Sequence, residues 1–327
     1  MAELSNAPQF IEAEADDHID DGDSALGDDA TLASSTTSIG SSILKNRTEN
    51  GRTYHSYKAG KYVLPNDEVN VEIILDDNLQ HHIYSLAYKG KLFLCPIDKD
   101  YTIHRVLDVG TGTGIWAIDY ADEHPESKVL GIDLSAIQPA FLPPNANFEI
   151  DDIEEEWTFT SKFDFIHARM MTGSLADWPK FFSQAFAHTS PGGYIELSDS
   201  VFPCECDDNS VTPSSALLRW STLLLEASQK LGRDIDSAKR YKAQLEAAGY
   251  VDVIELVHYW PMNRWPKDPK FKELGMWNCE NMLTGLSGFS MALFTRVLGM
   301  SAEEVEVYIV DARKEMKDTK IHAKWPM

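Results

Sequence analysis

The sequence predicts an α/β fold built on a mostly parallel sheet. Apolar stretches typical of buried strands alternate with helical patterns from residue 105 to residue 199, a rhythm typical of parallel strands joined by right-handed helical crossovers. A turn rich in glycine follows the first of these strands. With 327 residues and 43% hydrophobic content, the chain can form one large domain with additions.

Charge and cysteine content narrow the possible functions. The 52 acidic and 29 basic residues give a net charge of −23, which opposes binding to nucleic acid. Cys95, Cys204, Cys206 and Cys279 show no zinc-binding spacing, so we predict free thiols and no metal site. The sequence has no leader-like segment and no membrane-length apolar run. We therefore expect a cytoplasmic protein without a membrane partner.

Residues 1–44 are predicted to be a disordered acidic tail. They contain ten acidic side chains and no Lys or Arg, and so few large apolar residues cannot offset the entropy of ordering. A regulatory or partner-binding arm is the alternative. Residues 45–100 form a second region, an N-terminal lid segment with a helix, and residues 101–327 form the main domain.

The lid segment brings aromatic side chains together ahead of a helix. Tyr54, His55, Tyr57 and Tyr62 precede an amphipathic pattern that spans roughly 67–89. We expect this helix to lie across the domain as a cover. The tyrosines are explained either by packing or by contact with a ligand beneath the lid.

The glycine turn lies within RVLDVGTGTGIWA, residues 105–117. Gly110, Gly112 and Gly114 stand between a predicted strand and a predicted helix, where glycine lets a ligand approach the backbone and the helix N-terminus attracts negative atoms. The spacing is G-x-G-x-G, whereas the dinucleotide fingerprint is G-x-G-x-x-G. This disfavours an NAD-dependent oxidoreductase. Together with Asp108, the turn resembles motif I of class I S-adenosylmethionine (SAM) methyltransferases.

Acidic residues end the next two predicted strands. Asp133 ends KVLGID, 25 residues after Asp108, where a carboxylate can accept hydrogen bonds from both ribose hydroxyls; a helix N-cap is the alternative. Asp152 and Ile153 follow NFEID and are expected to bind the adenine amine and to pack on the ring. We prefer Asp152 over Asp151 because it adjoins the apolar residue. A solvated acidic loop explains the same run equally well.

The chain after residue 199 departs from a minimal domain. Helices are predicted over 212–232, 237–249 and 301–317, and VDVIELVHYW, residues 251–260, is expected to form a sixth strand. The apolar, Met-rich stretch 263–299 is expected to form a helical cap facing the substrate, although helical core packing accounts for the same composition.

Motifs from residue 54 onwards resemble the fungal LaeA-like methyltransferases. The matching stretches, in chain order, are YHSYKAGKYVLPND, VLDVGTGTGIWAID, GIDLSAIQP, FEIDDIEEEW, SLADWP, PGGYIEL, LFTRVLGMSAEEVEVYI and KIHA. The resemblance implies a Rossmann-like class I methyltransferase fold that uses SAM. Carried over by position, the cofactor residues are Asp108, Gly110, Gly112, Gly114, Asp133, Asp152 and Ile153. Relatives usually continue after KIHA into a final strand paired with the sixth; here that strand is expected to be short or missing.

Two functions are consistent with the resemblance. The first is methyl transfer to a small, largely apolar metabolite in secondary metabolism, and the second is nuclear regulation of secondary metabolism with protein partners. The candidate catalytic residues are His167, His55, Tyr57 and Asp199. His167 follows the fourth strand and is either a general base or a hydrogen-bonded core histidine. The residues do not specify the acceptor, and a dedicated base is optional.

Overall fold

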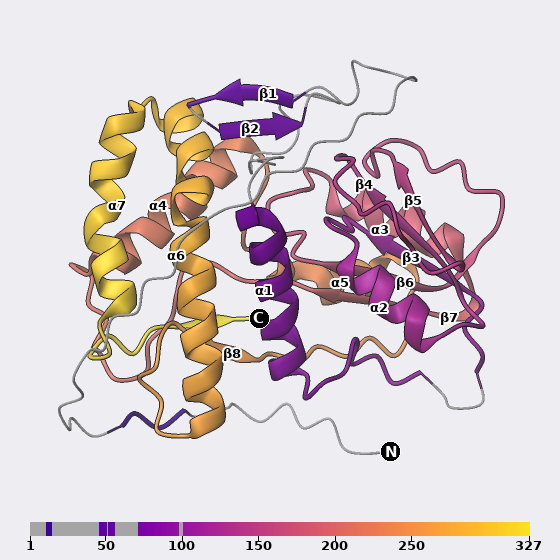
Figure 1. The fold of residues 1–327 in the computed structure, drawn as a ribbon, viewed down its shortest axis with the longest axis horizontal. Helices are drawn as coiled ribbons and strands as arrows, with labels where there is room; N and C mark the ends of the chain where they lie inside the picture. Colours follow the sequence, from indigo (N-terminus) through magenta and orange to yellow (C-terminus); the bar gives the residue numbers. More distant parts are fainter. Residues whose placement is uncertain (1–10, 15–45, 51, 56–70, 98–100) are drawn as a thin grey trace.

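A computed structural model of the chain describes residues 11–14, 46–50, 52–55, 71–97 and 101–327 (Figure 1). Most of the predicted acidic tail falls outside these ranges, as do Tyr57 and Tyr62. For His55, only the backbone is described. The proposed roles of these aromatic side chains therefore stay predictions.

Five parallel strands form the central sheet and confirm the predicted α/β class. They are β3 (Arg105–Val109), β4 (Lys128–Asp133), β5 (Ala146–Ile150), β6 (Phe163–Arg169) and β7 (Thr189–Ser198). Their order in the sheet is β5-β4-β3-β6-β7, and every neighbouring pair is parallel. The first strand in sequence thus lies at the centre, and the carboxyl ends of β3 to β6 meet at one edge.

Helices cover both faces of this sheet. Helix α2 (Ile115–Glu123) packs on one face, against Val106 and Phe165. Helices α3 (Trp178–His188) and α5 (Tyr241–Ala248), with the short helix η1 (Ser237–Arg240), lie on the other face. Both faces of the central strands β3, β4 and β6 are largely buried, which explains why these strands read as nearly continuous apolar runs. We call this part the α/β lobe.

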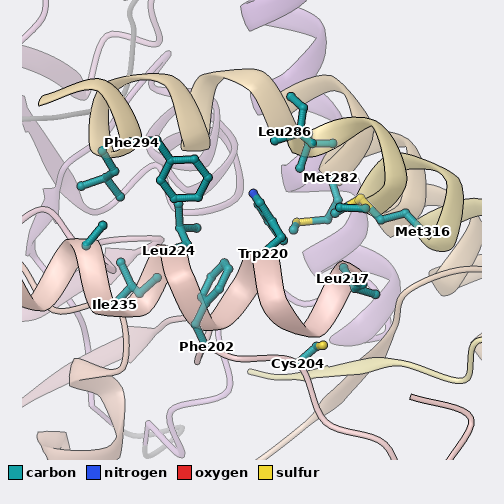
Figure 2. Packing of buried hydrophobic residues seen from close by; sticks show 14 of the residues in the cluster. Phe202, Cys204, Leu217, Trp220, Leu224, Ile235, Met282, Leu286, Phe294 and Met316 are labelled. Carbon is teal, nitrogen blue, oxygen red and sulfur yellow. The ribbon is translucent and has the colours of Figure 1, made fainter. Parts of the chain in front are cut away.

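A second lobe consists mainly of helices α4 (Ala216–Leu231), α6 (Pro269–Leu298) and α7 (Ala302–Lys317), with the hairpin of β1 (Asn46–Glu49) and β2 (Arg52–His55) beside them (Figure 1). Its core contains Trp220 from α4 and Phe294 from α6 (Figure 2). The Trp220 indole donates a hydrogen bond of 2.8 Å to Ser290 Oγ. We call this part the helical lobe. The apolar stretch 263–299 thus packs within this lobe.

Helix α1 (Val71–Ala87) lies between the two lobes (Figure 1). Its Ile83 and Tyr84 join a small buried cluster with Trp260 and Leu274. The Tyr84 hydroxyl also donates to the backbone oxygen of Ser198 at the end of β7, at 3.1 Å. The predicted helix over 67–89 is therefore present over 71–87, and it bridges the lobes.

The predicted sixth strand is wrong for most of residues 251–260. Only Tyr259 and Trp260 belong to a strand, β8 (Tyr259–Pro261), which pairs antiparallel with β9 (Lys324–Pro326), outside the central sheet. Trp325 of β9 is buried in the helical core, so β8 pairs there. Alternating apolar residues predict an extended backbone but do not specify its partner. Val251, at the start of this segment, is 82% exposed, so the segment is not a buried strand there. The expected short final strand is β9.

Four residues of the predicted tail contact the helical lobe. Ala13 forms an isolated β-bridge with Pro266, and the Lys267 amide donates to the backbone oxygen of Glu12 at 2.9 Å. Ile11 is buried. The expectation of a solvated tail is therefore wrong for residues 11–14, because Ile11 supplies apolar area, and Lys267 before α6 and Lys272 in its first turn pair with Glu12 and Glu14.

All four cysteines are free thiols. In the part of the chain that the structure describes, no helix is both long and apolar enough to cross a membrane. The 30 residues of α6 include charged side chains in its first turn and a half-buried Arg296 in its last turn. Helix α6 packs against α1, α4 and α7.

Candidate functional site

A cavity of about 210 Å³ opens at the carboxyl ends of the central strands. Its lining comes from the turns after β3 and β4, from residues 151–154 after β5, from the end of β6 and the loop after it, and from Gln80 of α1. The structure brings seven of the predicted site residues into this lining: Asp108, Gly110, Gly112, Asp133, Asp152, Ile153 and His167. No described residue of 263–299 contributes, so the predicted cap does not face this cavity.

The glycine turn is held against the neighbouring strand. The amides of Gly110 and Thr111 both donate to the backbone oxygen of Ile132 in β4, at 2.9 and 3.0 Å. Gly110 and Gly112 have φ angles of +66° and +57°, in the left-handed region that favours glycine. A Cβ at Gly110 would lie 2.2 Å from the Met171 sulfur. The backbone thus lies close to the cavity because side chains are absent here.

Gly114 has a different role from the one predicted. It is the N-cap of α2, with φ +83°, and it does not line the cavity. A Cβ there would lie 2.3 Å from Cζ of Phe148 in β5. Its contacts therefore give Gly114 a role in packing α2 against the sheet.

The carboxylates of Asp133 and Asp152 are fixed by backbone amides. Asp133 accepts from the Gly112 amide through Oδ2 and from the Ser135 amide through Oδ1, both at 2.9 Å. Asp152 is buried, and its Oδ1 accepts from the Glu154 amide at 3.0 Å. These amide contacts orient the Asp133 carboxylate within the cavity lining. Ile153 lines the cavity beside Asp152.

Asp108 and His167 form a buried pair at the centre of the site. Asp108 Oδ1 lies 2.7 Å from His167 Nδ1, and Asp108 Oδ2 accepts from Thr111 Oγ1 at 2.6 Å. The His167 ring stacks on Trp116, with centroids 3.6 Å apart and planes 6° from parallel. Burial lowers the pKa of His167, although the Asp108 carboxylate acts in the opposite direction. At neutral pH the imidazole is therefore uncharged and donates to Asp108, which orients it.

Sequence reasoning missed Trp116 and Arg169 as site residues. Trp116 lies in the first turn of α2 and presents its ring to His167. Arg169 lies two residues after His167 in β6, and both line the cavity. Side chains two apart in a strand point to the same face, so the position of His167 was a usable signal for Arg169.

Asp199 lies outside the cavity lining. It is buried after β7, where Oδ1 accepts from the Thr172 amide at 2.8 Å and Oδ2 accepts from the Tyr241 hydroxyl at 2.7 Å. These contacts fix the loop after β6 against η1 and α5. Burial raises the pKa of Asp199 to about 6, and the hydrogen bonds with Tyr241 and Thr172 only partly offset this effect.

The raised pKa of Asp199 predicts a pH-dependent stability. Between its unfolded pKa of about 3.9 and its folded pKa, the native state binds the proton more tightly, so stability falls as pH rises through the folded value. We expect the free energy of unfolding of the wild type to lose about 1 kcal/mol between pH 5 and pH 7 from this group. Urea unfolding at pH 5, 6 and 7 measures it, with Asp199→Asn as the control that lacks the effect. Equal pH slopes for the two proteins would contradict it.

The charge of the lining matches a cationic nucleoside ligand. Among the described residues, the cavity lining contains five acidic side chains but only one Arg or Lys side chain, Arg169. The acidic residues are Asp108, Asp133, Asp151, Asp152 and Glu154. Such a field attracts a cation and repels polyphosphate. Fixed acceptors beside an apolar Ile153 suit a ribose and an adenine ring. The residues present therefore fit SAM, whose sulfonium carries a positive charge.

Comparison with known proteins decides the family. A family model described as a methyltransferase domain matches residues 79–255. The methyltransferase pytC of Aspergillus terreus is 39% identical over 291 residues, 89% of this chain and 88% of that protein. The chain belongs to the fungal LaeA-like methyltransferase family.

Other relatives carry two kinds of name. The secondary metabolism regulator LAE1 of Cochliobolus heterostrophus is 37% identical, over 85% of this chain and 91% of that protein. The probable methyltransferase tdiE of Emericella nidulans is 33% identical, over 76% and 78%. A SAM-dependent methyltransferase of Geobacter sulfurreducens, solved with S-adenosylhomocysteine, is 15% identical, over 75% of this chain and 95% of that one, with a TM-score of 0.40. The match to the methyltransferase domain model and to methyltransferases such as pytC and tdiE supports SAM as the cofactor of this chain.

Proposed function

We propose that this LaeA-like methyltransferase transfers a methyl group from SAM to a small, largely apolar metabolite in fungal secondary metabolism. The observation that carries the proposal is the cavity at the carboxyl ends of the strands, in which fixed carboxylates at the ends of β4 and β5 adjoin an apolar wall. That wall consists of Met170, Met171 and Leu175 from the end of β6 and the loop after it. Pockets for small acceptors are mostly apolar with a few fixed polar groups, and flexible methionines adapt to varied shapes.

Each half of the cavity has its own task in this proposal. Asp133 accepts from the ribose hydroxyls, Asp152 accepts from the adenine amine, and Ile153 packs on the ring. The glycine turn lets the ligand lie against the backbone of Gly110 and Gly112. SAM itself supplies an activated methyl group on a cationic sulfur. The protein therefore mainly has to orient the two reactants and exclude water, and orientation alone accounts for effective molarities of ~10⁵–10⁸ M.

A dedicated base is not required by this arrangement. His167 already donates through Nδ1 to Asp108 and is packed on Trp116. Asp199 is engaged by Thr172 and Tyr241, outside the cavity. In this proposal both residues hold the site in shape, and acceptors that need no deprotonation by the enzyme are favoured. His55 and Tyr57 stay candidates for contact from the lid.

The second candidate is a nuclear regulator of secondary metabolism that acts with protein partners. The names of LAE1 and of the laeA proteins, secondary metabolism regulators, favour it. The names pytC and tdiE favour the enzyme, as does the apolar cavity wall. Free cysteines suit a reducing compartment such as the cytoplasm or the nucleus. The net charge of −23 makes nucleic acid an unfavourable direct substrate.

Deleting the gene in its host and comparing metabolite profiles by mass spectrometry separates the two candidates. The enzyme predicts that one compound series becomes lighter by one CH₂ group and that purified protein with SAM restores the mass. The regulator predicts the loss of many unrelated compounds together. The second result, without any methylation by the purified protein, would overturn the proposed function.

A further inference from the structure

Arg169 is the only Arg or Lys among the described residues that line the cavity. It ends β6 and is half-buried. In the described part of the chain, no carboxylate lies within ion-pair distance of its guanidinium, and its one hydrogen bond runs from Nη2 to Nδ1 of His81 at 3.2 Å. A partly buried cation without an acidic partner is costly unless a ligand supplies the counter-charge.

Two residues of α1 hold this guanidinium in place. Its central carbon lies 4.6 Å from the centre of the Tyr84 ring, a cation–π distance. Because His81 accepts from Arg169 at Nδ1, the proton of the neutral imidazole resides on Nε2, which lies 3.1 Å from Asp119 Oδ2 in α2. The orientation of Arg169 is therefore fixed before any ligand binds, while Nη1 and Nε remain available to it in the described structure.

The sheet order shows which part of SAM would reach Arg169. The proposed ribose and adenine contacts follow β4 and β5, on one side of the central strand β3. Arg169 ends β6, on the other side. A ligand whose nucleoside lies at β4 and β5 and which passes the glycine turn after β3 thus extends toward β6. At that end SAM carries its amino acid group, which includes its only carboxylate.

We propose that Arg169 binds the carboxylate of the methionyl group of SAM, an inference that rests on the proposed function. The guanidinium fork matches a carboxylate bidentately. The five acidic side chains of the lining favour the sulfonium but repel this carboxylate, so a local cation is needed to hold the anionic end. Because His81 and Tyr84 of α1 position that cation, the carboxylate site depends on how α1 packs against the end of β6.

Isothermal titration calorimetry with SAM and with decarboxylated SAM tests this assignment. We expect the wild type to bind SAM about 10- to 100-fold more tightly than decarboxylated SAM, the size typical of a hydrogen-bonded charge pair. In Arg169→Gln the ratio should fall to about one or below, mainly through weaker SAM binding. In Arg169→Lys, which keeps the charge but loses the fork, an intermediate ratio is expected.

Arg105→Gln is the matched control. Arg105 is the first residue of β3, at the amino ends of the strands and away from the cavity. Its guanidinium carbon lies 5.4 Å from the centre of the Phe163 ring, so the variant also loses an Arg–aromatic contact on a strand. It should keep the wild-type ratio. Equal affinity of the wild type for both ligands, or an unchanged ratio in Arg169→Gln, would overturn the role of Arg169 alone. If the folded wild type bound neither ligand, the proposed function itself would fail.

Discussion

Replacing Asp133 with alanine is expected to weaken SAM binding by about 100-fold or more. A carboxylate that accepts from two ribose hydroxyls makes two charge-assisted hydrogen bonds, and each is worth about 1.5–3 kcal/mol. The backbone amides of Gly112 and Ser135 fix the Asp133 side chain in advance, so little side-chain entropy is lost on binding. Calorimetric titration of the purified variant with SAM and with S-adenosylhomocysteine measures the loss.

Asp164→Ala controls for the structural part of this substitution. Asp164 is the second residue of β6, at the amino ends of the strands, and its Oδ2 also accepts from two backbone amides, those of His104 and Arg105, at 2.9 and 3.1 Å. Both variants thus lose a carboxylate that supports a strand end, but only Asp133 faces the cavity. Retention of SAM affinity within about threefold in Asp133→Ala would rule out the ribose contact, since one lost charged hydrogen bond already exceeds it.

Replacing Asp108 with alanine is expected to lower the free energy of unfolding by about 3 kcal/mol, because it leaves buried donors on His167 and Thr111 without their acceptor. Asp108 and His167 are 3% and 1% exposed, so leaving their polar groups unpaired carries a desolvation cost. Urea unfolding followed by circular dichroism measures the change.

A second substitution tests the cause of that loss. In Asp108→Ala/His167→Phe the phenyl ring can keep the stack on Trp116, while the unpartnered imidazole N–H is gone. Removing both members of a buried pair costs less than removing one, so the double variant should recover about 1 kcal/mol relative to Asp108→Ala. If the double variant were less stable than Asp108→Ala, the unpaired N–H of His167 would not be the cause of the stability loss.

The sequence was sufficient to predict the central sheet and the acids at its edge. The three central strands β3, β4 and β6 are largely apolar because helices bury both of their faces, and that pattern is local. Asp133 is the last residue of β4 and Asp152 comes two residues after β5, so predicting the strand ends also predicted their convergence. Both residues line the cavity because the carboxyl ends of parallel strands meet at the same end of the sheet.

Features that depend on distant partners were not predictable in this way. The extended segment 251–258 has an alternating pattern, but its neighbour β8 pairs with β9, some 60 residues later. The apolar face of α6 packs on α4 and α7 instead of over the strand ends. Arg169 shares a strand face with His167, but its contacts with His81 and Tyr84 of α1, which fix its guanidinium, depend on how α1 packs. No local pattern encodes which helix lies against which strand end.

The division of the buried side chains between two lobes has a consequence for unfolding experiments. Trp220 and Trp325 belong to the core of the helical lobe, whereas Trp116 and Trp178 belong to the α/β lobe. The cluster around Ile83 of α1, which links them, has four buried members in the described residues. Domains that share little buried area lose their cooperativity when one is weakened. Tryptophan fluorescence of Asp108→Ala should therefore show two separate transitions, with the α/β lobe melting first while Trp220 stays shielded from water.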